Sequence, residues 1–267
     1  MATIEQRIGK RIGSAIYKYK MIQPKDRILV AVSGGKDSLT MLYDLLRRKK
    51  SFPIPYEVEA VHIQTDFCSC CKKSRLEELF QEWGARYHII PVPVMKRLQE
   101  GQKMNCYWCS SQRRMELLKL ARERRCNKLA LGHHMDDIIE TLFMNICYKG
   151  EMATMLPVFT YHKFPYTVIR PLAMVKEREI IRFAADKGLT QLVCKCPYGQ
   201  NSKRKVIREA IAGLSRQDKS VREMIFKSMS NVNMDYLYPE DKCDHQVPPI
   251  TDDVFFAGLE DESAVVR

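Results

Sequence analysis

A short motif near the amino-terminal end of the chain combines two glycines with a lysine, an aspartate and two serines. It consists of Ser33, Gly34, Gly35, Lys36, Asp37 and Ser38. The apolar run 28–32 precedes it, and the segment 39–46 that follows has its apolar residues at helical spacing. This order predicts a strand, a tight loop and a helix. Because glycines let the backbone approach a ligand and the N–H groups at a helix start attract anions, the motif predicts a phosphate-binding loop.

The side chains of this motif are those expected for nucleotide chemistry. Lys36 supplies a positive charge and Ser38 a hydroxyl group, whereas the carboxylate of Asp37 suits an anion site only if a divalent cation such as Mg²⁺ bridges it to the phosphates. The spacing differs from the Walker A loop and from the dinucleotide-binding G-x-G-x-x-G pattern. It resembles the PP-loop of the ATP pyrophosphatases, which cleave ATP to AMP and pyrophosphate. A glycine-rich turn that binds no ligand is the alternative.

A second polar group follows the predicted strand 128–132. His133 comes directly after Gly132, and Asp136 and Asp137 open the next predicted helix. The two carboxylates could contact a metal ion, position a base or simply cap the helix. His133 could line the nucleotide site or satisfy a hydrogen bond in the core.

Two pairs of closely spaced cysteines lie far apart in the sequence. Cys106 and Cys109 have C-x-x-C spacing, and Cys194 and Cys196 follow after several further predicted elements. The two pairs could form a zinc site with four thiolates, and three of the thiolates could instead hold an iron–sulfur cluster with one iron open to another ligand. A redox-active pair is a further alternative for Cys106 and Cys109. The spacing alone does not distinguish these sites.

The remaining cysteines carry no clear metal-binding pattern. Cys126 and Cys147 lie in predicted helical stretches and are expected to be buried as small apolar side chains. Cys243, near the carboxyl-terminal end, is expected to be inert. A close group of three is interpreted as structural or incidental, with a persulfide relay or a second metal site as the alternative. The group consists of Cys68, Cys70 and Cys71.

Strand and helix patterns alternate along the chain. Strands are predicted over 27–32, 57–63, 87–92, 128–132 and 167–172, and helices over 3–20, 38–49, 73–83, from 106 onward, over 138–148 and 176–187, from 203 onward, and over 216–234. The alternation predicts an α/β fold with a doubly wound parallel sheet, in which ligands bind at the carboxyl ends of the strands. We expect three parts: an N-terminal amphipathic helix (1–24), a domain with the nucleotide motif and the cysteines (25–215), and a C-terminal helix with a surface tail (216–267).

The composition is that of a basic globular protein. The chain has 267 residues, of which 45% are hydrophobic, and its 44 Lys and Arg against 32 Asp and Glu give a net charge of +12. This excess favours a polyanionic partner, most simply nucleic acid. Candidate phosphate contacts are Arg113, Arg114, Lys203, Arg204 and Lys205. The sequence contains no recognisable signal peptide and no apolar run of transmembrane length, so we expect a cytoplasmic protein that does not associate with membranes.

Taken together, these motifs resemble the tRNA 2-thiocytidine synthetase family, a branch of the PP-loop tRNA thiolation enzymes. The resemblance covers about residues 5–235 and rests on the segments 21–38, 106–114, 132–137 and 169–172, followed by the cysteine segment near 194–196. It implies the PP-loop ATP pyrophosphatase fold, which is HUP-like. It also implies ATP, Mg²⁺ and a [4Fe-4S] cluster, and the transfer of sulfur to C2 of a cytidine at position 32 in the tRNA anticodon loop.

The resemblance implies roles for particular residues. The motif 33–38 would bind ATP together with Gly132 and His133. The residues implied in catalysis are Lys36, Asp37, Asp136 and Asp137. Cys106 and Cys109 would be two cluster ligands, and the third would be Cys196, with Cys194 as the alternative.

The chemistry follows from the poor reactivity of a pyrimidine C2 carbonyl. Transfer of AMP to its oxygen creates a leaving group that sulfur can displace. A sulfur donor such as a cysteine desulfurase is implied as a partner, and a homodimer is expected from related enzymes. Three other functions remain open at this point: synthesis of 2-thiouridine, a cluster-independent PP-loop ligase similar to tRNA lysidine synthetase, and a non-enzymatic RNA-binding module with a zinc site.

Overall fold

The computed structural model describes residues 2–67, 72–161, 165–189 and 203–237. The chain divides into two compact units, Met1–Lys227 and Ser228–Arg267. The described part of the second unit contains one short 3-10 helix, η2 (Met234–Tyr236). The domain limits expected from the sequence stay predictions.

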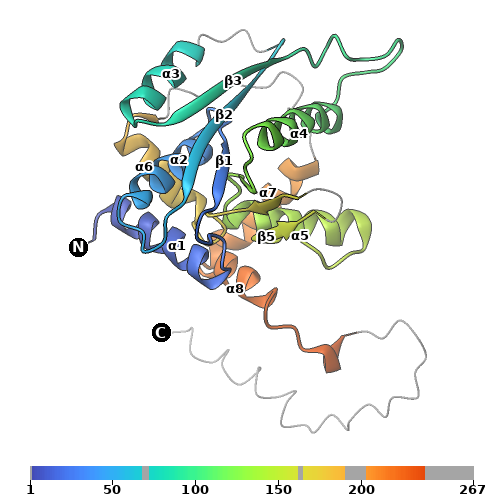
Figure 1. The fold of residues 1–267 in the computed structure, drawn as a ribbon. Coiled ribbons are helices and arrows are strands. Elements are labelled where there is room, and N and C mark those ends of the chain that lie inside the picture. Colours follow the sequence, from blue (N-terminus) through green and yellow to red (C-terminus); the bar gives the residue numbers. More distant parts are fainter. Residues whose placement is uncertain (1, 68–71, 162–164, 190–202, 238–267) are drawn as a thin grey trace, which may run out of the picture. The chain divides into compact units, whose positions relative to one another are not determined.

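The described residues form one mixed but mainly parallel sheet (Figure 1). Its strands are β1 (Arg27–Ala31), β2 (Glu57–Thr65), β3 (Arg86–Val92), β4 (Lys128–Ala130), β5 (Val158–Thr160) and β6 (Thr167–Ile169). They lie in the order β3-β2-β1-β4-β6-β5. Every neighbouring pair is parallel except β5 and β6, which are antiparallel. The expected doubly wound parallel sheet is confirmed.

The edge strand β5 was not predicted from the sequence. It has three residues, and two of them are exposed. A strand this short shows no apolar alternation, and only its pairing with β6 defines it. Val158 lies opposite Ile169, and Thr160 lies opposite Thr167.

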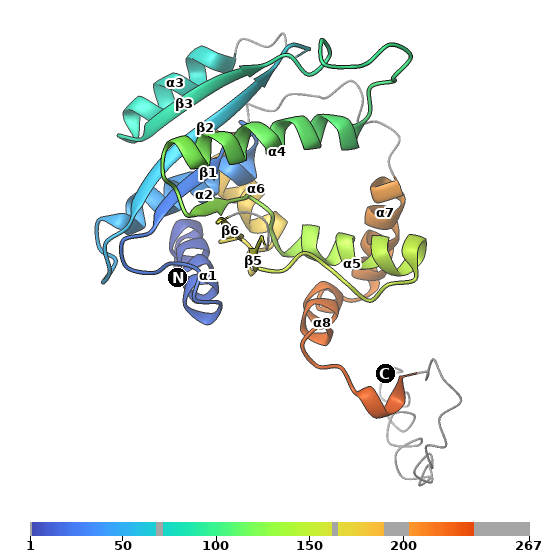
Figure 2. The same ribbon diagram turned by 45° about the vertical axis from the view of Figure 1, so that its right-hand side comes forward.

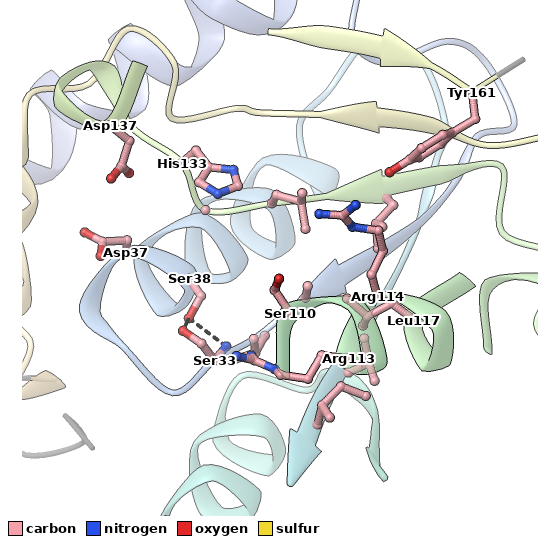
Figure 3. Close-up of a pocket in the computed structure, with 17 residues that line it drawn as sticks. Ser33, Asp37, Ser38, Ser110, Arg113, Arg114, Leu117, His133, Asp137 and Tyr161 are labelled. Carbon is pink, nitrogen blue, oxygen red and sulfur yellow. Dashed lines mark hydrogen bonds between the residues drawn. The ribbon is translucent and has the colours of Figure 1, made fainter. Parts of the chain in front are cut away.

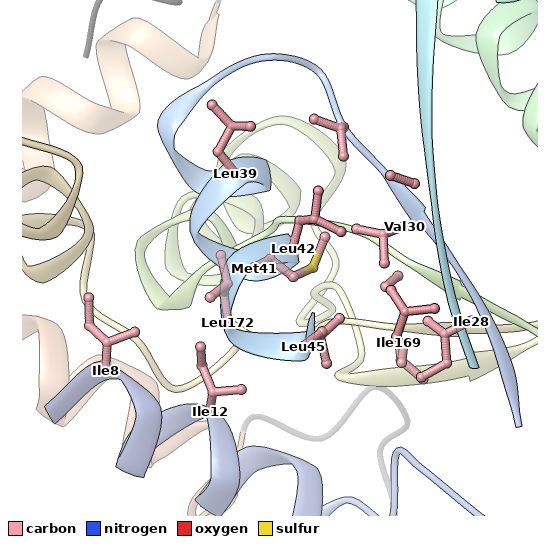
Figure 4. Packing of buried hydrophobic residues seen from close by; sticks show 14 of the residues in the cluster. Ile8, Ile12, Ile28, Val30, Leu39, Met41, Leu42, Leu45, Ile169 and Leu172 are labelled. Atoms are coloured by element: carbon pink, nitrogen blue, oxygen red, sulfur yellow. The ribbon is translucent and has the colours of Figure 1, made fainter. Parts of the chain in front are cut away.

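Helices cover both faces of the sheet. They are α1 (Ile4–Lys18), α2 (Lys36–Lys49), α3 (Lys72–Glu82), α4 (Cys106–Glu123), α5 (Met135–Lys149), α6 (Glu177–Asp186), α7 (Lys203–Gln217) and α8 (Val221–Ser228). Apolar residues of α1, α2, α3 and α6 form the larger core cluster, part of which is drawn in Figure 4. Helix α4 covers the other face, across which it lies in Figure 2.

Strand β1 connects the two cores because alternate side chains of a strand point to opposite faces. Ile28 and Val30 belong to the larger cluster, whereas Leu29 belongs to the cluster under α4. All three side chains are fully buried. This burial on both sides explains the uninterrupted apolar run that precedes the glycines.

Helix α1 has the amphipathic character expected from its sequence. Ile8, Ile12 and Ile16 are buried against the larger core. Thr3 caps the helix through its hydroxyl, which accepts a hydrogen bond from the N–H of Gln6. The helix therefore packs as part of the first unit and does not stand apart from the sheet.

The carboxyl-terminal helices differ from the prediction. The sequence predicted one helix over 216–234, but α7 continues to Gln217 and α8 covers only Val221–Ser228. The carboxylate of Asp218 accepts hydrogen bonds from the N–H of Ser220 at 2.6 Å and from its hydroxyl at 2.7 Å. This local turn competes with helix formation and separates the two helices.

The structure also corrects the prediction for one cysteine. Cys126 is buried as expected, although it lies beyond the end of α4 and not in a helix, whereas Cys147 is exposed in the last turn of α5. The group at 68–71 and Cys243 lie outside the described residues. In the described part of the chain, no helix combines the length and the apolar character that crossing a membrane requires.

Candidate active site

A cavity of about 370 Å³ opens at the carboxyl ends of β1 and β4 (Figure 3). β1 and β4 are neighbours in the sheet. After β1 the chain passes through α2 into β2, which lies on the opposite side of β1 from β4. Such a reversal of strand order leaves a crevice in which ligands of open α/β sheets bind. The polar residues that line the cavity are Ser33, Asp37, Ser38, Ser110, Arg113, Arg114, His133, Asp137 and Tyr161.

The loop after β1 is held by its two serines. The hydroxyl of Ser38 accepts a hydrogen bond from the N–H of Ser33 at 3.1 Å and donates one to the carbonyl of Gly35 at 3.0 Å. Gly34 has φ of +82°, a conformation that side chains disfavour. Gly35 then precedes the first turn of α2. The loop and the helix start are thus folded before any ligand arrives, as a phosphate-binding loop requires.

Gly132 is needed because two backbones meet there. A Cβ atom at this position would lie 3.1 Å from both Cα and N of Ser38 and 3.3 Å from the carbonyl carbon of Asp37. The end of β4 and the start of α2 therefore pack directly against one another. This contact sets the distance between the loop and His133, the next residue in the chain.

His133 lines the cavity as a neutral imidazole. Its Nδ1 accepts a hydrogen bond from Nε of Arg170 at 3.2 Å, so the proton of the neutral ring resides on Nε2. Burial and the adjacent Arg170 guanidinium lower the pKa of His133 to about 4. Near neutral pH this side chain can donate a hydrogen bond but carries no charge.

The carboxylates of Asp136 and Asp137 lie in different environments, although the two residues are adjacent in the sequence. Asp137 lines the cavity and also caps α5, because its carboxylate accepts a hydrogen bond from the N–H of His134 at 3.1 Å. Asp136 is buried, and its carboxylate accepts hydrogen bonds from the N–H of Glu177 at 2.7 Å and from Arg222 at 2.7 Å. The capping interpretation thus describes one function of Asp137, and Asp136 joins α5 to α6 and α8.

Lys36 is paired with two carboxylates beside the cavity. Its Nζ lies 3.0 Å from Oδ1 of Asp37 and 3.0 Å from Oε1 of Glu177. Partial burial opposes the charged form of this lysine, but the two carboxylates outweigh it and raise the pKa of Lys36. The lysine stays protonated, and a phosphate group entering the loop would meet a positive charge that is already present.

Helix α4 supplies the opposite wall of the cavity. Ser110, Arg113, Arg114 and Leu117 face it, at the spacing of one helical stripe. The Nε of Arg113 is buried and has no hydrogen-bond partner in the described part of the chain. A buried donor of this kind costs stability until an acceptor reaches it, so it fits an anionic ligand.

The cysteine pair opens the same helix. Cys106 is exposed and Cys109 is half-buried, and they lie in the first turn of α4, one turn before the cavity-lining stripe. Cys194 and Cys196 both fall in the range 190–202, outside the described residues. Within the described ranges, no group of three cysteine, histidine or carboxylate side chains is positioned to hold a metal ion.

The basic start of α7 is partly engaged within the protein. Arg204 donates to the hydroxyl of Thr141 at 3.2 Å and lies 3.7 Å from a carboxylate oxygen of Asp137. The Nζ of Lys203 lies 4.6 Å from the ring centroid of Tyr148. Lys205 is exposed. Arg204 therefore helps to hold α7 beside the cavity, whereas Lys205 faces solvent.

The structure brings together most of the predicted site residues and adds others. The loop 33–38 meets the His133 segment, and α4 faces both. Arg170 and Glu177 were not assigned roles from the sequence, because each acts on a partner far along the chain. Tyr161 and Ser110 were likewise missed as cavity-lining residues.

Known proteins are similar to this chain in sequence or in fold. A family model described as a PP-loop domain matches residues 3–214. The tRNA-cytidine(32) 2-sulfurtransferase of Citrifermentans bemidjiense is 37% identical over 246 residues, which cover 89% of this chain and 96% of the relative. The enzyme of the same name from Marinobacter nauticus is 35% identical over 242 residues, covering 88% of this chain and 78% of the relative.

Among solved structures, the U34-tRNA thiolase NcsA from Methanococcus maripaludis with its [4Fe-4S] cluster has a similar fold. It has a TM-score of 0.67 at 20% sequence identity, with 93% of this chain and 85% of that chain covered. At this identity the likeness concerns the fold. The match to the family model and the identity to the curated relatives confirm the family expected from the motifs: the chain belongs to the PP-loop family and, within it, to the tRNA-cytidine(32) 2-sulfurtransferase family.

Proposed function

We propose that the protein is an ATP-dependent tRNA sulfurtransferase that replaces the C2 oxygen of cytidine 32 by sulfur. The observation that carries the proposal is the cavity at the carboxyl ends of β1 and β4. It joins the PP-loop, the neutral His133 and the Arg113 face of α4, the helix that begins with the cysteine pair. The curated relatives named for this activity match nearly the whole chain.

The first step is transfer of AMP from ATP to the C2 oxygen of the base. The oxygen forms a bond to the α-phosphorus, and pyrophosphate leaves. The N–H groups at the start of α2 and the charge of Lys36 would stabilise the departing phosphates. His133 would donate a hydrogen bond from its Nε2–H to an oxygen of the nucleotide, and the ring would stay neutral. Asp37 and Asp137 supply carboxylate oxygens suited to Mg²⁺.

The second step is displacement of AMP from C2 by a sulfur nucleophile. We propose that Cys106 and Cys109 hold a [4Fe-4S] cluster together with Cys196, or with Cys194 in its place. Two thiols one helical turn apart at the edge of the cavity fit two corners of such a cluster. When bound, the cluster would supply an iron that is not occupied by a protein thiolate.

The basic residues near the cavity are proposed contacts to tRNA phosphates. Arg113 and Arg114 line the cavity itself, and Lys203, Arg204 and Lys205 lie at the start of α7. We also propose a cysteine desulfurase as the sulfur source, a homodimer as the assembly, and the cytoplasm as the compartment where the tRNA is met.

The test is thiolation of a tRNA transcript by protein purified and assayed without oxygen. ATP, Mg²⁺, sulfide and tRNA are incubated with the protein, and the digested nucleosides are analysed by mass spectrometry. We expect 2-thiocytidine from a transcript with cytidine 32 and none from the same transcript with uridine 32. A modified uridine, or a modification that contains no sulfur, would refute the proposal.

Two variants test the site in the same assay. Lys36→Ala should abolish both thiolation and release of pyrophosphate. Cys106→Ser should abolish thiolation and the absorbance of the cluster but leave ATP binding intact. Cys147→Ser is the matched control, because Cys147 is an exposed cysteine outside the cavity. Full thiolation by Cys106→Ser would contradict the role of the cluster.

A further inference from the structure

An exposed tyrosine lies between the two cysteines of α4. Tyr107 is 83% exposed, although tyrosine normally buries much of its ring. Its neighbour Trp108 behaves in the opposite way: its indole Nε1 donates to the carbonyl of Val94 at 3.2 Å, and it packs against the core under α4. The sequence Cys-Tyr-Trp-Cys thus places one aromatic ring inside and one outside.

The backbone that carries Tyr107 is firmly held. Asn105 caps α4 by accepting a hydrogen bond from the N–H of Trp108 at 2.8 Å. The carbonyl of Tyr107 itself accepts a hydrogen bond from the hydroxyl of Ser110 at 2.9 Å. The exposed ring therefore projects from an ordered helical turn, and its exposure does not come from a loose loop.

Helical geometry places this ring at the edge of the cavity. Ser110 and Arg114, which line the cavity, follow Tyr107 by three and seven residues and so share its face of α4. One helical turn, about 5 Å, separates Tyr107 from Ser110 along the axis. Since side chains in a helix lean towards its amino-terminal end, the ring extends outward from the mouth of the cavity.

Basic residues lie on the same face of α4 and on a neighbouring helix. Arg114 on the same face is exposed. In both Figure 1 and Figure 2 the first turn of α4 lies close to the start of α7, which carries Lys203 and Lys205. An exposed aromatic ring beside basic side chains is the combination that binds single-stranded nucleic acid, because the ring stacks on a base while the cations contact phosphates.

We propose that Tyr107 is the stacking platform for an unpaired base of the tRNA anticodon loop, next to the nucleotide that enters the cavity. This inference rests on the proposed function and adds a residue that recognises the substrate. The loop of a tRNA offers unstacked bases, and a base held on Tyr107 would fix the register of its neighbour in the cavity. The hydroxyl group is not needed for this role, but the aromatic face is.

The experiment measures binding of the full-length protein to a fluorescent tRNA transcript with cytidine 32. Stacking on an aromatic side chain is worth about 1–3 kcal/mol per base, so Tyr107→Ala should weaken the tRNA Kd by about 5- to 150-fold. Tyr107→Phe should bind like the wild type, and Tyr107→Leu should be as weak as Tyr107→Ala. Tyr17→Ala is the matched control, because Tyr17 is 88% exposed on α1.

The salt dependence of binding separates stacking from charge. For Tyr107→Ala the slope of log Kd against log salt should equal that of the wild type, whereas Arg114→Ala should lower it by about one. The affinity for ATP should not change in Tyr107→Ala. If the wild type neither binds nor thiolates this tRNA, the proposed function itself fails.

Two results would overturn the inference while leaving the proposed function intact. The first is a wild type that binds and thiolates the tRNA together with a Tyr107→Ala variant that binds as tightly as Tyr17→Ala. The second is a Tyr107→Ala variant that changes only the oligomeric state seen by light scattering, which would make the ring a contact between copies of the chain.

Discussion

Replacing Gly132 by alanine should push the PP-loop away from β4. The new Cβ would meet two backbone atoms of Ser38 at 3.1 Å and one of Asp37 at 3.3 Å. These atoms belong to the first turn of a buried helix and cannot rotate aside as a flexible side chain could. The start of α2 must therefore move by several tenths of an ångström, together with the hydrogen bonds that join Ser33 to Ser38.

The cost can be estimated from overpacking in protein cores. Adding one methyl group to such a contact typically costs about 1–3 kcal/mol of unfolding free energy. For a domain of this size, 1 kcal/mol shifts Tm by about 2–4 °C, so Tm should fall by about 2–12 °C. ATP should bind about tenfold more weakly or worse, because the N–H groups of the loop no longer converge on one point.

Calorimetry of ATP binding and thermal melting of Gly132→Ala measure both effects. Gly213→Ala is the matched control, because a Cβ there would meet only the tip of the Arg216 side chain at 3.6 Å. In the interior of α7 that change should be neutral or stabilise by up to about 1 kcal/mol. A Gly132→Ala protein with the wild-type ATP affinity and Tm would refute the direct backbone contact between β4 and the loop.

Three further predictions concern the buried side chains of His133, Glu140 and Cys126. The pKa of His133 is about 4 and lies below its ordinary value of 6.5. The unfolded chain therefore takes up a proton first as the pH falls, so stability should drop by up to about 3 kcal/mol from pH 6.5 to pH 4. When the free energy of unfolding is measured in urea at several pH values, His133→Asn should lack this part of the pH dependence. Arg208→Ala should cost about 1–3 kcal/mol, because it leaves Glu140, 1% exposed, without its close partner. Urea unfolding of the double variant with Glu140→Gln should recover part of this loss. Burial raises the pKa of Cys126 to about 11, so iodoacetamide at pH 8 should label the exposed Cys147 and spare Cys126, as read by mass spectrometry.

The fold could be predicted from the sequence because its signals are local. The run Ile28–Val32 is apolar without interruption since β1 is buried on both faces, and a helical face follows directly. The phosphate-binding loop could be predicted for the same reason: the glycines, Lys36 and Ser38 all act within one turn of chain. The break at Asp218 was missed because a single side-chain turn interrupts an otherwise helical pattern.

The sequence by itself thus determined the α/β class, the PP-loop and the family, because each motif that carries them is formed by near neighbours along the chain. The tertiary structure added the strand order and the edge strand β5, because strand pairing joins residues far apart in the sequence. The tertiary structure alone decided the surroundings of the titratable groups. Burial in the fold and Arg170, which is 37 residues away, together keep His133 neutral, and Glu177 meets Lys36 across 141 residues. Asp136 and Asp137 are adjacent in sequence, yet one joins three helices and the other lines the cavity. Their different surroundings arise because successive residues of a helix point about 100° apart, so neighbours in the chain face different parts of the fold.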